Sequence, residues 1–92
     1  MYYIYILLSK KNRRLYVGYT VDLRRRLREH QKGLVPSTKK DRPWELIYYE
    51  AYRNKWDALR REKFFKSGWG KNYIRKILRN YLNPQILRFP KR

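Results

Sequence analysis

Hydrophobic positions along the chain fall into short runs that predict three strands. Residues 2–8 form a continuous apolar run rich in aromatic and β-branched side chains, and residues 14–19 form a second run after a polar turn at 9–12. These two runs predict a β-hairpin. Residues 44–52 form a third run, after a loop at 34–43 that contains two prolines, and we expect a third strand there.

The register of the hairpin decides which side chains meet across it. With a four-residue loop, Leu8 faces Arg13 and Tyr5 faces Tyr16. The two phenols are then cross-strand neighbours on one face of the sheet. A slip of one residue would place them on opposite faces, so this pairing is a hypothesis about register.

Residues 21–32 show helical spacing, with Leu23, Arg26, Leu27 and His30 on one side. This is the apolar side, so an arginine and the only histidine in the chain face the core. A solvated basic helix has no need of that arrangement. It predicts a polar site between this helix and the element on which the helix packs.

The ends of this helix carry recognisable signals. Thr20 is the expected N-cap, and Asp22 suits the positive N-terminus of the helix dipole. Gly33 is the expected C-cap.

Two more helices are expected after the third strand. The second begins at Asn54 as N-cap and runs to about Ser67, where Gly68 and Gly70 break it. Glu62 lies in the middle of its apolar side, which also contains Ala58, Leu59, Phe65 and Trp69. Residues 72–82 predict the third helix.

The predicted order is β-β-α-β-α-α. It indicates an α+β fold in which helices flank a three-stranded antiparallel sheet. We expect one domain over residues 1–82 and a basic C-terminal tail over residues 83–92.

The charge of the chain narrows the classes of partner. Its 92 residues contain 25 Lys and Arg against 7 Asp and Glu, a net charge of +18. A polyanion would relieve that self-repulsion, and nucleic acid is the first candidate, before an acidic membrane surface.

No apolar run approaches the roughly 20 residues that span a bilayer, and the N-terminal run lacks the features of a signal peptide. The absence of cysteine excludes disulfides and Cys-based zinc sites, and we expect a cytoplasmic protein.

Several segments together resemble a known family. Tyr3-Ile4-Tyr5, then ten residues, then Tyr16-Val17-Gly18 resembles the paired motif of the GIY-YIG endonucleases. The helix with Arg26 and His30, the strand near Pro43 to Glu50, and Arg61-Glu62-Lys63 are similar to the later parts of that domain. The resemblance covers residues 2–80, and it is nearest to small members that consist of this domain alone.

The resemblance implies divalent-metal-dependent cleavage of DNA phosphodiester bonds. Tyr5 and Tyr16 match the two motif tyrosines, one of which activates the attacking water. Arg26 matches the arginine that binds the scissile phosphate, His30 a residue that orients the site, and Glu62 the metal ligand.

Two features depart from the family pattern. Tyr3 stands where the first motif has glycine. Asn72 lies near the place of a late asparagine found in many members, but it is out of register.

The chemistry is consistent with these roles. Phosphodiester hydrolysis needs a positioned water, a proton acceptor and positive charge on the developing phosphorane, which the planar fork of Arg26 supplies well. Glu62 could hold one Mg²⁺ or Mn²⁺, because Mg²⁺ often takes only one or two protein carboxylates. Acidic residues are too few for a site with two metals, and a single histidine without cysteine argues against zinc. A phenol has a pKa of about 10, and which of Tyr5 and Tyr16 acts as the base stays open.

The expected function is therefore a metal-dependent endonuclease, structure- or backbone-directed, of the kind used in DNA repair or recombination. DNA is the expected partner, RNA stays open, and neither a membrane nor a small-molecule cofactor is expected; the oligomeric state is undetermined. The residues expected to bind nucleic acid are Arg25, Arg26, Lys39 and Lys40.

Other readings stay open at this point. One is a non-catalytic nucleic-acid-binding module with the same fold, and another is a basic protein that docks on RNA or a larger assembly. Arg26 and Glu62 could form a structural ion pair between two helices. The three tryptophans, Trp44, Trp56 and Trp69, are expected in the core.

Overall fold

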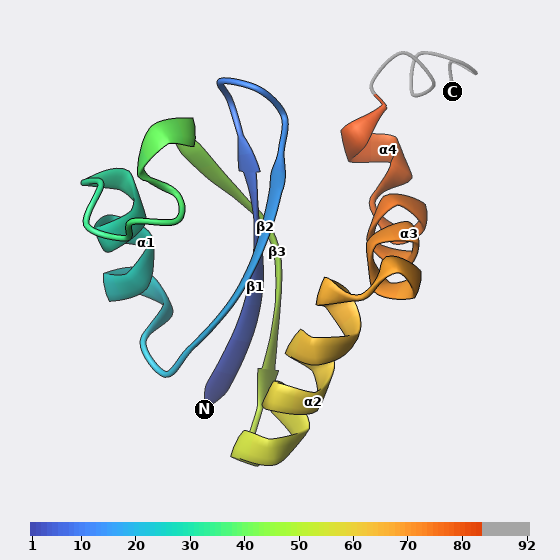
Figure 1. Ribbon diagram of the computed structural model, residues 1–92. Helices are drawn as coiled ribbons and strands as arrows, with labels where there is room; N and C mark the ends of the chain where they lie inside the picture. The colour runs from blue at the N-terminus through green and yellow to red at the C-terminus, as the bar shows by residue number, and fades with distance from the viewer. Residues whose placement is uncertain (84–92) are drawn as a thin grey trace. The chain divides into compact units, whose positions relative to one another are not determined.

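The structure, a computed structural model, describes residues 1–83 (Figure 1). Its elements are β1 (Tyr2–Ser9), β2 (Leu15–Thr20), α1 (Leu23–Gln31), the short 3₁₀ helix η1 (Lys39–Asp41), β3 (Trp44–Tyr52), α2 (Lys55–Lys66), α3 (Gly68–Ile77) and α4 (Arg79–Leu82). The predicted C-terminal tail, apart from Asn83, lies outside the described residues. The chain divides into two compact units, Met1–Glu62 and Lys63–Arg92. The expectation of one domain over residues 1–82 stays a prediction.

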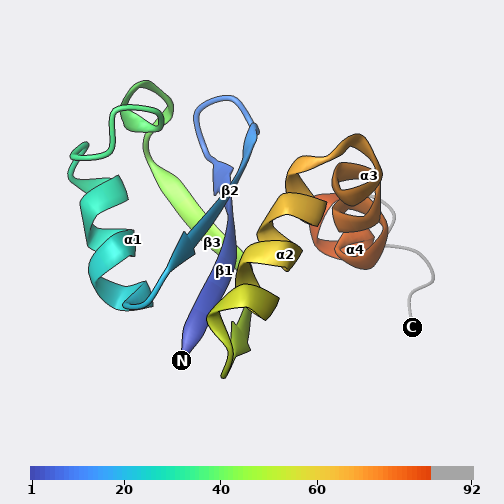
Figure 2. The same cartoon turned by 60° about the horizontal axis from the view of Figure 1, so that its bottom comes forward.

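The first unit is built on an antiparallel sheet with strand order β2-β1-β3. The α1 helix lies on one side of this sheet, and the part of α2 that belongs to the first unit lies on the other (Figures 1 and 2). The predicted α+β fold with a three-stranded antiparallel sheet is confirmed.

The central strand β1 is buried on both faces. Ile4, Ile6 and Leu8 alternate along it with Tyr5 and Leu7, and all five side chains are buried. A strand covered on both sides has no need of polar alternation. This explains why its sequence is a continuous apolar run.

The predicted hairpin register is wrong by two residues. Tyr5 pairs with Gly18, and Tyr16 pairs with Leu7. A shift of two residues keeps every side chain on its face because the side-chain period of a strand is two. The two phenols therefore still share a face, and their ring centroids lie 6.3 Å apart.

The shift arises because the loop lies one residue later along the chain than expected. The Ser9 amide donates to the Arg14 carbonyl at 2.9 Å, so the closing pair is displaced by one residue on each strand. Inside the loop, the Ser9 hydroxyl accepts from the amides of Lys11 and Asn12, each at 3.1 Å. Arg13 has a φ of 63°, a left-handed conformation that the sequence did not indicate.

The ends of α1 follow standard capping rules, with one correction. Asp22, and not Thr20, is the N-cap, and its carboxylate accepts from the Arg25 amide at 3.1 Å. At the other end Gly33 has a φ of 77° and donates to the His30 carbonyl at 3.1 Å. Leu34 then donates to Glu29 at 2.9 Å, which completes a Schellman motif.

The predicted C-terminal helices need a second correction. Asn54 caps α2 as expected, since its side chain accepts from the Trp56 amide at 2.8 Å. Gly68 and Gly70 do not separate two helices by a loop; they form the first turn of α3, whose N-cap Ser67 accepts from the Gly70 amide at 3.1 Å. The helix predicted over residues 72–82 is divided at Leu78 into α3 and α4.

The tryptophans divide between core and surface. Trp44 is 4% exposed and belongs to the core, as expected. Trp56 and Trp69 are 68% and 82% exposed, so their predicted burial is wrong. Trp69 falls in the first turn of α3, where the apolar periodicity predicted for α2 no longer applies, and Trp56 falls in the first turn of α2.

Candidate active site

The centre of the candidate site is the phenol of Tyr5, which crosses the sheet toward β2. It lies over Gly18, the residue paired with it, and a Cβ atom at Gly18 would come within 2.3 Å of the Tyr5 hydroxyl oxygen. Gly18 lies inside β2 and not at a turn. Glycine is needed at this position because the Tyr5 phenol occupies the space that any larger side chain would fill.

Tyr5 is joined to α1 by a hydrogen bond. Its hydroxyl lies 2.7 Å from Nε2 of His30, the only residue of α1 that is completely buried. The ring of Tyr16, from β2, packs edge-on against the same imidazole with centroids 5.2 Å apart. The sheet and α1 therefore bring Tyr5, Tyr16 and His30 together, as the polar site predicted at this interface requires.

Thr38, in the loop before η1, completes the chain of hydrogen bonds. Its hydroxyl lies 2.8 Å from Nδ1 of His30 and donates to the Val35 carbonyl at 3.3 Å. Since that hydroxyl uses its proton on Val35, it accepts from Nδ1–H of the imidazole. The free lone pair of His30 is then on Nε2, and Tyr5 donates to it.

Sequence reasoning missed Thr38. It lies in a loop without hydrophobic periodicity, and only the fold brings it to His30. It is fully buried and its carbonyl accepts from the Trp44 indole at 2.8 Å. Gln31 adds a second anchor for the same loop, because its side-chain oxygen accepts from the Trp44 amide at 3.1 Å.

Arg26 approaches the phenol from one turn earlier on α1. Its guanidinium is bound by Glu29 at 2.9 Å, so its ion-pair partner is on its own helix. It also hydrogen-bonds Tyr5, and this contact favours the phenolate. The Arg26 side chain is about one third exposed, which leaves part of it accessible to a ligand.

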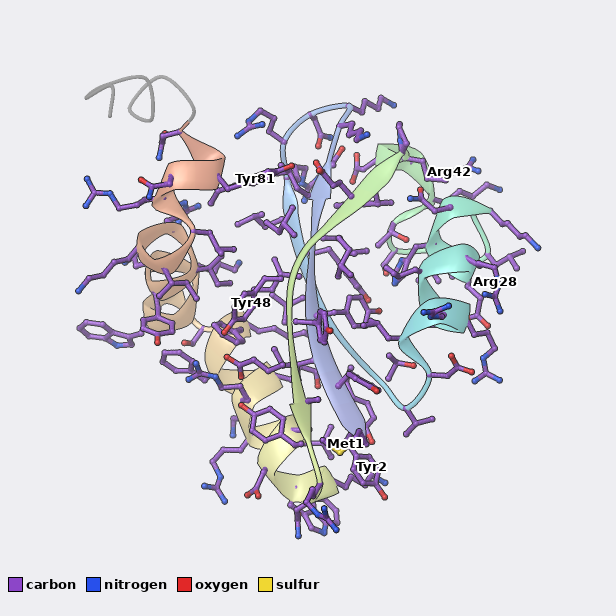
Figure 3. All side chains as sticks on the ribbon, turned by 180° about the vertical axis from the view of Figure 1, so that it is seen from behind. Met1, Tyr2, Arg28, Arg42, Tyr48 and Tyr81 are labelled. Atoms are coloured by element: carbon purple, nitrogen blue, oxygen red, sulfur yellow. The ribbon has the colours of Figure 1, made fainter. Side chains whose placement is uncertain are left out.

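Glu62 lies on α2 next to Arg61, whose side chain binds β3. The Arg61 guanidinium donates two hydrogen bonds, of 2.9 and 3.1 Å, to the Glu50 carboxylate of β3. Tyr48, labelled in Figure 3, and Tyr52 donate to the same carboxylate. Although burial opposes ionisation, these partners hold the pKa of Glu50 below its usual value. Glu62, half-buried, acts on Tyr5 through its charge.

Burial is the largest influence on the pKa values of Tyr5 and His30. It raises the pKa of Tyr5 to about 12; hydrogen bonding and charge from Arg26 oppose the rise, whereas Tyr16 and Glu62 add to it. Burial also lowers the pKa of His30 to about 4, and the charge of Arg26 lowers it further. At neutral pH the site therefore contains a neutral phenol that donates to a neutral imidazole.

Donor chemistry suits a hard divalent cation. Within residues 1–83 no group of three or more His, Asp or Glu residues is placed to hold a metal ion. Glu62 would be the protein ligand of a Mg²⁺ or Mn²⁺ ion, the remaining positions being left to water and substrate oxygens, as Mg²⁺ commonly requires. An all-protein zinc site does not fit this donor set.

The residues predicted to bind nucleic acid lie on two exposed segments beside the site. Arg25 is on the outer part of α1 and pairs with Glu29 at 3.8 Å. Lys39 and Lys40 are exposed in η1, directly after Thr38. Arg28 also lies on the side of α1 that points away from the sheet (Figure 3). The role of these cations in binding stays a prediction.

Two phenols, a guanidinium and an imidazole gathered between the sheet and α1 are the residue types expected of a phosphodiester-cleaving domain. Residues 1–75 match the family described as GIY-YIG catalytic domain. The chain therefore belongs to the GIY-YIG family of nucleases, whose members act on nucleic acid and generally use a divalent metal.

Bacterial relatives cover most of the chain. A UPF0213 protein of Pediococcus acidilactici is 35% identical over 82 residues, which are 86% of this chain and 83% of the relative. A UPF0213 protein of Pediococcus pentosaceus is 38% identical over 80 residues, with the same two coverages. A UPF0213 protein of Streptococcus agalactiae is 40% identical over 65 residues, or 70% of this chain and 73% of the relative.

In residues 1–83 no helix is long and apolar enough to span a membrane.

Proposed function

We propose that this protein is a divalent-metal-dependent endonuclease that hydrolyses DNA phosphodiester bonds in a structure- or backbone-directed way. The observation that carries the proposal is the 2.7 Å hydrogen bond between the Tyr5 hydroxyl and Nε2 of His30. The same phenol contacts Arg26, and the charge of Glu62 raises its pKa. His30 and Arg26 of α1 thus act directly on the phenol oxygen, and Glu62 of α2 acts on it through its charge alone.

Tyr5 and His30 form the proposed path for the proton of the attacking water. The phenol oxygen takes that proton as its own proton moves to Nε2 of His30. The imidazolium keeps both of its hydrogen bonds, because Nδ1–H continues to donate to Thr38. A phenol with a pKa of about 12 is a poor base alone, and the neutral imidazole gives it an acceptor. Tyr16 would help to position the water.

Arg26 is the proposed phosphate ligand. Its planar fork can bind two phosphate oxygens, and it stabilises the negative charge that develops as water attacks. Glu29, at 2.9 Å, holds the guanidinium in place before substrate arrives.

Glu62 is the proposed metal ligand. A divalent ion held by Glu62 would supply positive charge that stabilises the leaving group. The Arg61–Glu50 pair fixes this turn of α2 against β3, so the carboxylate is held in position by the fold.

The exposed cations favour recognition of the DNA backbone. Arg25, Lys39 and Lys40 can neutralise phosphates on either side of the site. Phosphate contacts position a duplex but do not read its sequence. We therefore propose that substrates are selected by their shape, as at branches or flaps.

A cleavage assay with matched variants tests this function. Plasmid and branched DNA are incubated with Mg²⁺ or Mn²⁺ and wild type, Arg26→Ala or Glu62→Gln, each variant with an exposed control on the same helix, Arg24→Ala or Asp57→Asn. We expect the two site variants to lose at least about 100-fold in rate, because each removes charge stabilisation of the transition state. Equal cleavage by wild type and Glu62→Gln would show that the metal assignment is wrong.

One observation favours a second candidate, a non-catalytic nucleic-acid-binding module. Among the described residues every buried side-chain polar atom has a hydrogen-bond partner, as a purely structural network would have. If wild type binds every DNA substrate and cleaves none with either metal, this candidate is supported and the endonuclease is rejected.

A further inference from the structure

The C-terminal unit, Lys63–Arg92, has an unusual charge. Glu62 is the last acidic residue in the sequence, so this unit contains no Asp or Glu. Its described part, residues 63–83, carries six cationic side chains: Lys63, Lys66, Lys71, Arg75, Lys76 and Arg79. This excess of positive charge attracts an anionic partner.

An exposed aromatic stripe runs along α3 in this unit. Trp69, Tyr73 and Ile77 recur at four-residue spacing, which places them in one row on the helix. Trp69 is 82% exposed, and Tyr73 and Ile77 are each 38% exposed. The inward side of α3 is occupied by other residues, since Ile74 and Gly70 are buried. The row is therefore not the core-facing side of the helix.

The two aromatic residues of the row are held differently. Tyr73 is packed against Phe64 and Phe65, with ring centroids 5.7 and 6.2 Å apart, so it forms the fixed base of the row. Trp69, one turn earlier, exposes most of its indole. At helical spacing Asn72 and Lys76 lie beside Trp69 on the polar side, which puts a donor and a cation next to the exposed ring.

We propose that this surface, defined by Trp69, Tyr73 and Lys76, binds single-stranded nucleic acid, with an unpaired base stacked on Trp69 and its phosphate near Lys76. Aromatic rings among cations are the means by which proteins hold single strands. A second copy of this chain is a poor occupant, because it would bring the same positive charge to the contact. The inference goes beyond the proposed function, since hydrolysis at Tyr5 does not require it.

Binding to oligonucleotides with and without bases tests the proposal. Fluorescence anisotropy is measured in EDTA with a short oligothymidylate and an abasic oligonucleotide of equal length and charge. Wild type is expected to prefer the oligothymidylate. Trp69→Ala should weaken oligothymidylate binding roughly 5- to 100-fold and remove that preference, whereas Trp69→Phe should retain part of it. Lys76→Ala should weaken binding to both oligonucleotides.

Trp56→Ala is the matched control. Trp56 is also a helical tryptophan, 68% exposed, but the Lys55 ammonium covers its ring at 5.6 Å. We expect this variant to bind like wild type. Equal affinity of wild type for the two oligonucleotides, or an equal loss in both tryptophan variants, would overturn the proposal.

Two further measurements test whether a membrane or a second copy of the chain binds this surface instead. Tight binding to phosphatidylserine vesicles that is lost in Trp69→Ala, with DNA binding unchanged, would assign the surface to membranes and overturn the proposal. A wild-type dimer in sedimentation that becomes monomeric in Trp69→Ala would assign it to self-association. The assay contains no metal, so its result is independent of whether the protein cleaves DNA.

Discussion

At the scale of single residues, the candidate site depends on the space left by the absent side chain of Gly18 as well as on the side chains of Tyr5 and His30. Gly18 leaves room for the Tyr5 phenol, and His30 gives that phenol an acceptor. The sequence indicated both residues, but it did not indicate why Gly18 is glycine. Thr38 was missed entirely, because a loop residue that contacts a helix eight positions earlier leaves no periodic signal.

Replacing Gly18 by alanine should destabilise the protein by about 1–3 kcal/mol, the usual cost of overpacking. The new Cβ would lie 2.3 Å from the Tyr5 hydroxyl, and the phenol would have to move away from His30. Urea unfolding followed by circular dichroism measures the change. Gly68→Ala is the control: nothing lies within 4 Å of its Cβ, so it should be neutral or stabilising. Equal stability of Gly18→Ala and wild type would contradict the packing argument.

The stability of the protein should fall on acidification between pH 6.5 and about 4. Burial holds the pKa of His30 at about 4 in the folded protein, below its ordinary value of 6.5. In that window the unfolded chain binds a proton and the folded chain does not, so acid favours unfolding. The loss should reach at most roughly 3 kcal/mol near pH 4, with no contribution from this group above pH 6.5.

The chain has one histidine, so His30→Gln removes this titration completely. Unfolding free energies of the variant and wild type, measured at several pH values, should differ in their slope between pH 4 and 6.5. Identical slopes would show that His30 is not buried in its neutral form.

At the scale of elements, prediction succeeded where hydrophobic pattern alone decides the structure. Residues 44–52 were predicted as a strand and form β3 with the same bounds, because a run of apolar and aromatic residues has few alternatives. Prediction failed where one polar contact sets a boundary. Thr20 and Asp22 are both acceptable caps by residue type, and only the geometry of the chain selects Asp22.

Removing the Asp22 cap should destabilise the protein by about 1 kcal/mol. The carboxylate accepts from the Arg25 amide at 3.1 Å, and Asp22→Ala leaves that amide without its partner. Asp22→Asn keeps the acceptor and removes only the charge, so it should retain most of the stability. Thermal unfolding of the two variants compares them. If both variants lose the same amount, charge and not capping explains the effect.

At the scale of the whole molecule, the site residues come from separate positions in the sequence and meet only through the fold. Their order was indicated by resemblance to a family, and the paired tyrosines by periodicity. Their geometry was not, because a register shift of two residues is invisible in a pattern of period two. That same property kept Tyr5 and Tyr16 on one face despite the wrong register.

The net charge of +18 should make salt act in opposite directions on folding and on DNA binding. Raising NaCl from about 50 to about 200 mM screens the repulsion between cations in the free protein, so the melting temperature should rise. The same change should weaken binding to duplex DNA by at least about 100-fold, because fewer counterions are released from the phosphates. Thermal unfolding and anisotropy titrations at matched salt concentrations measure the two effects. A melting temperature that falls with salt would mean that ion pairs such as Arg61–Glu50 outweigh the repulsion, and an affinity independent of salt would argue against phosphate-directed binding.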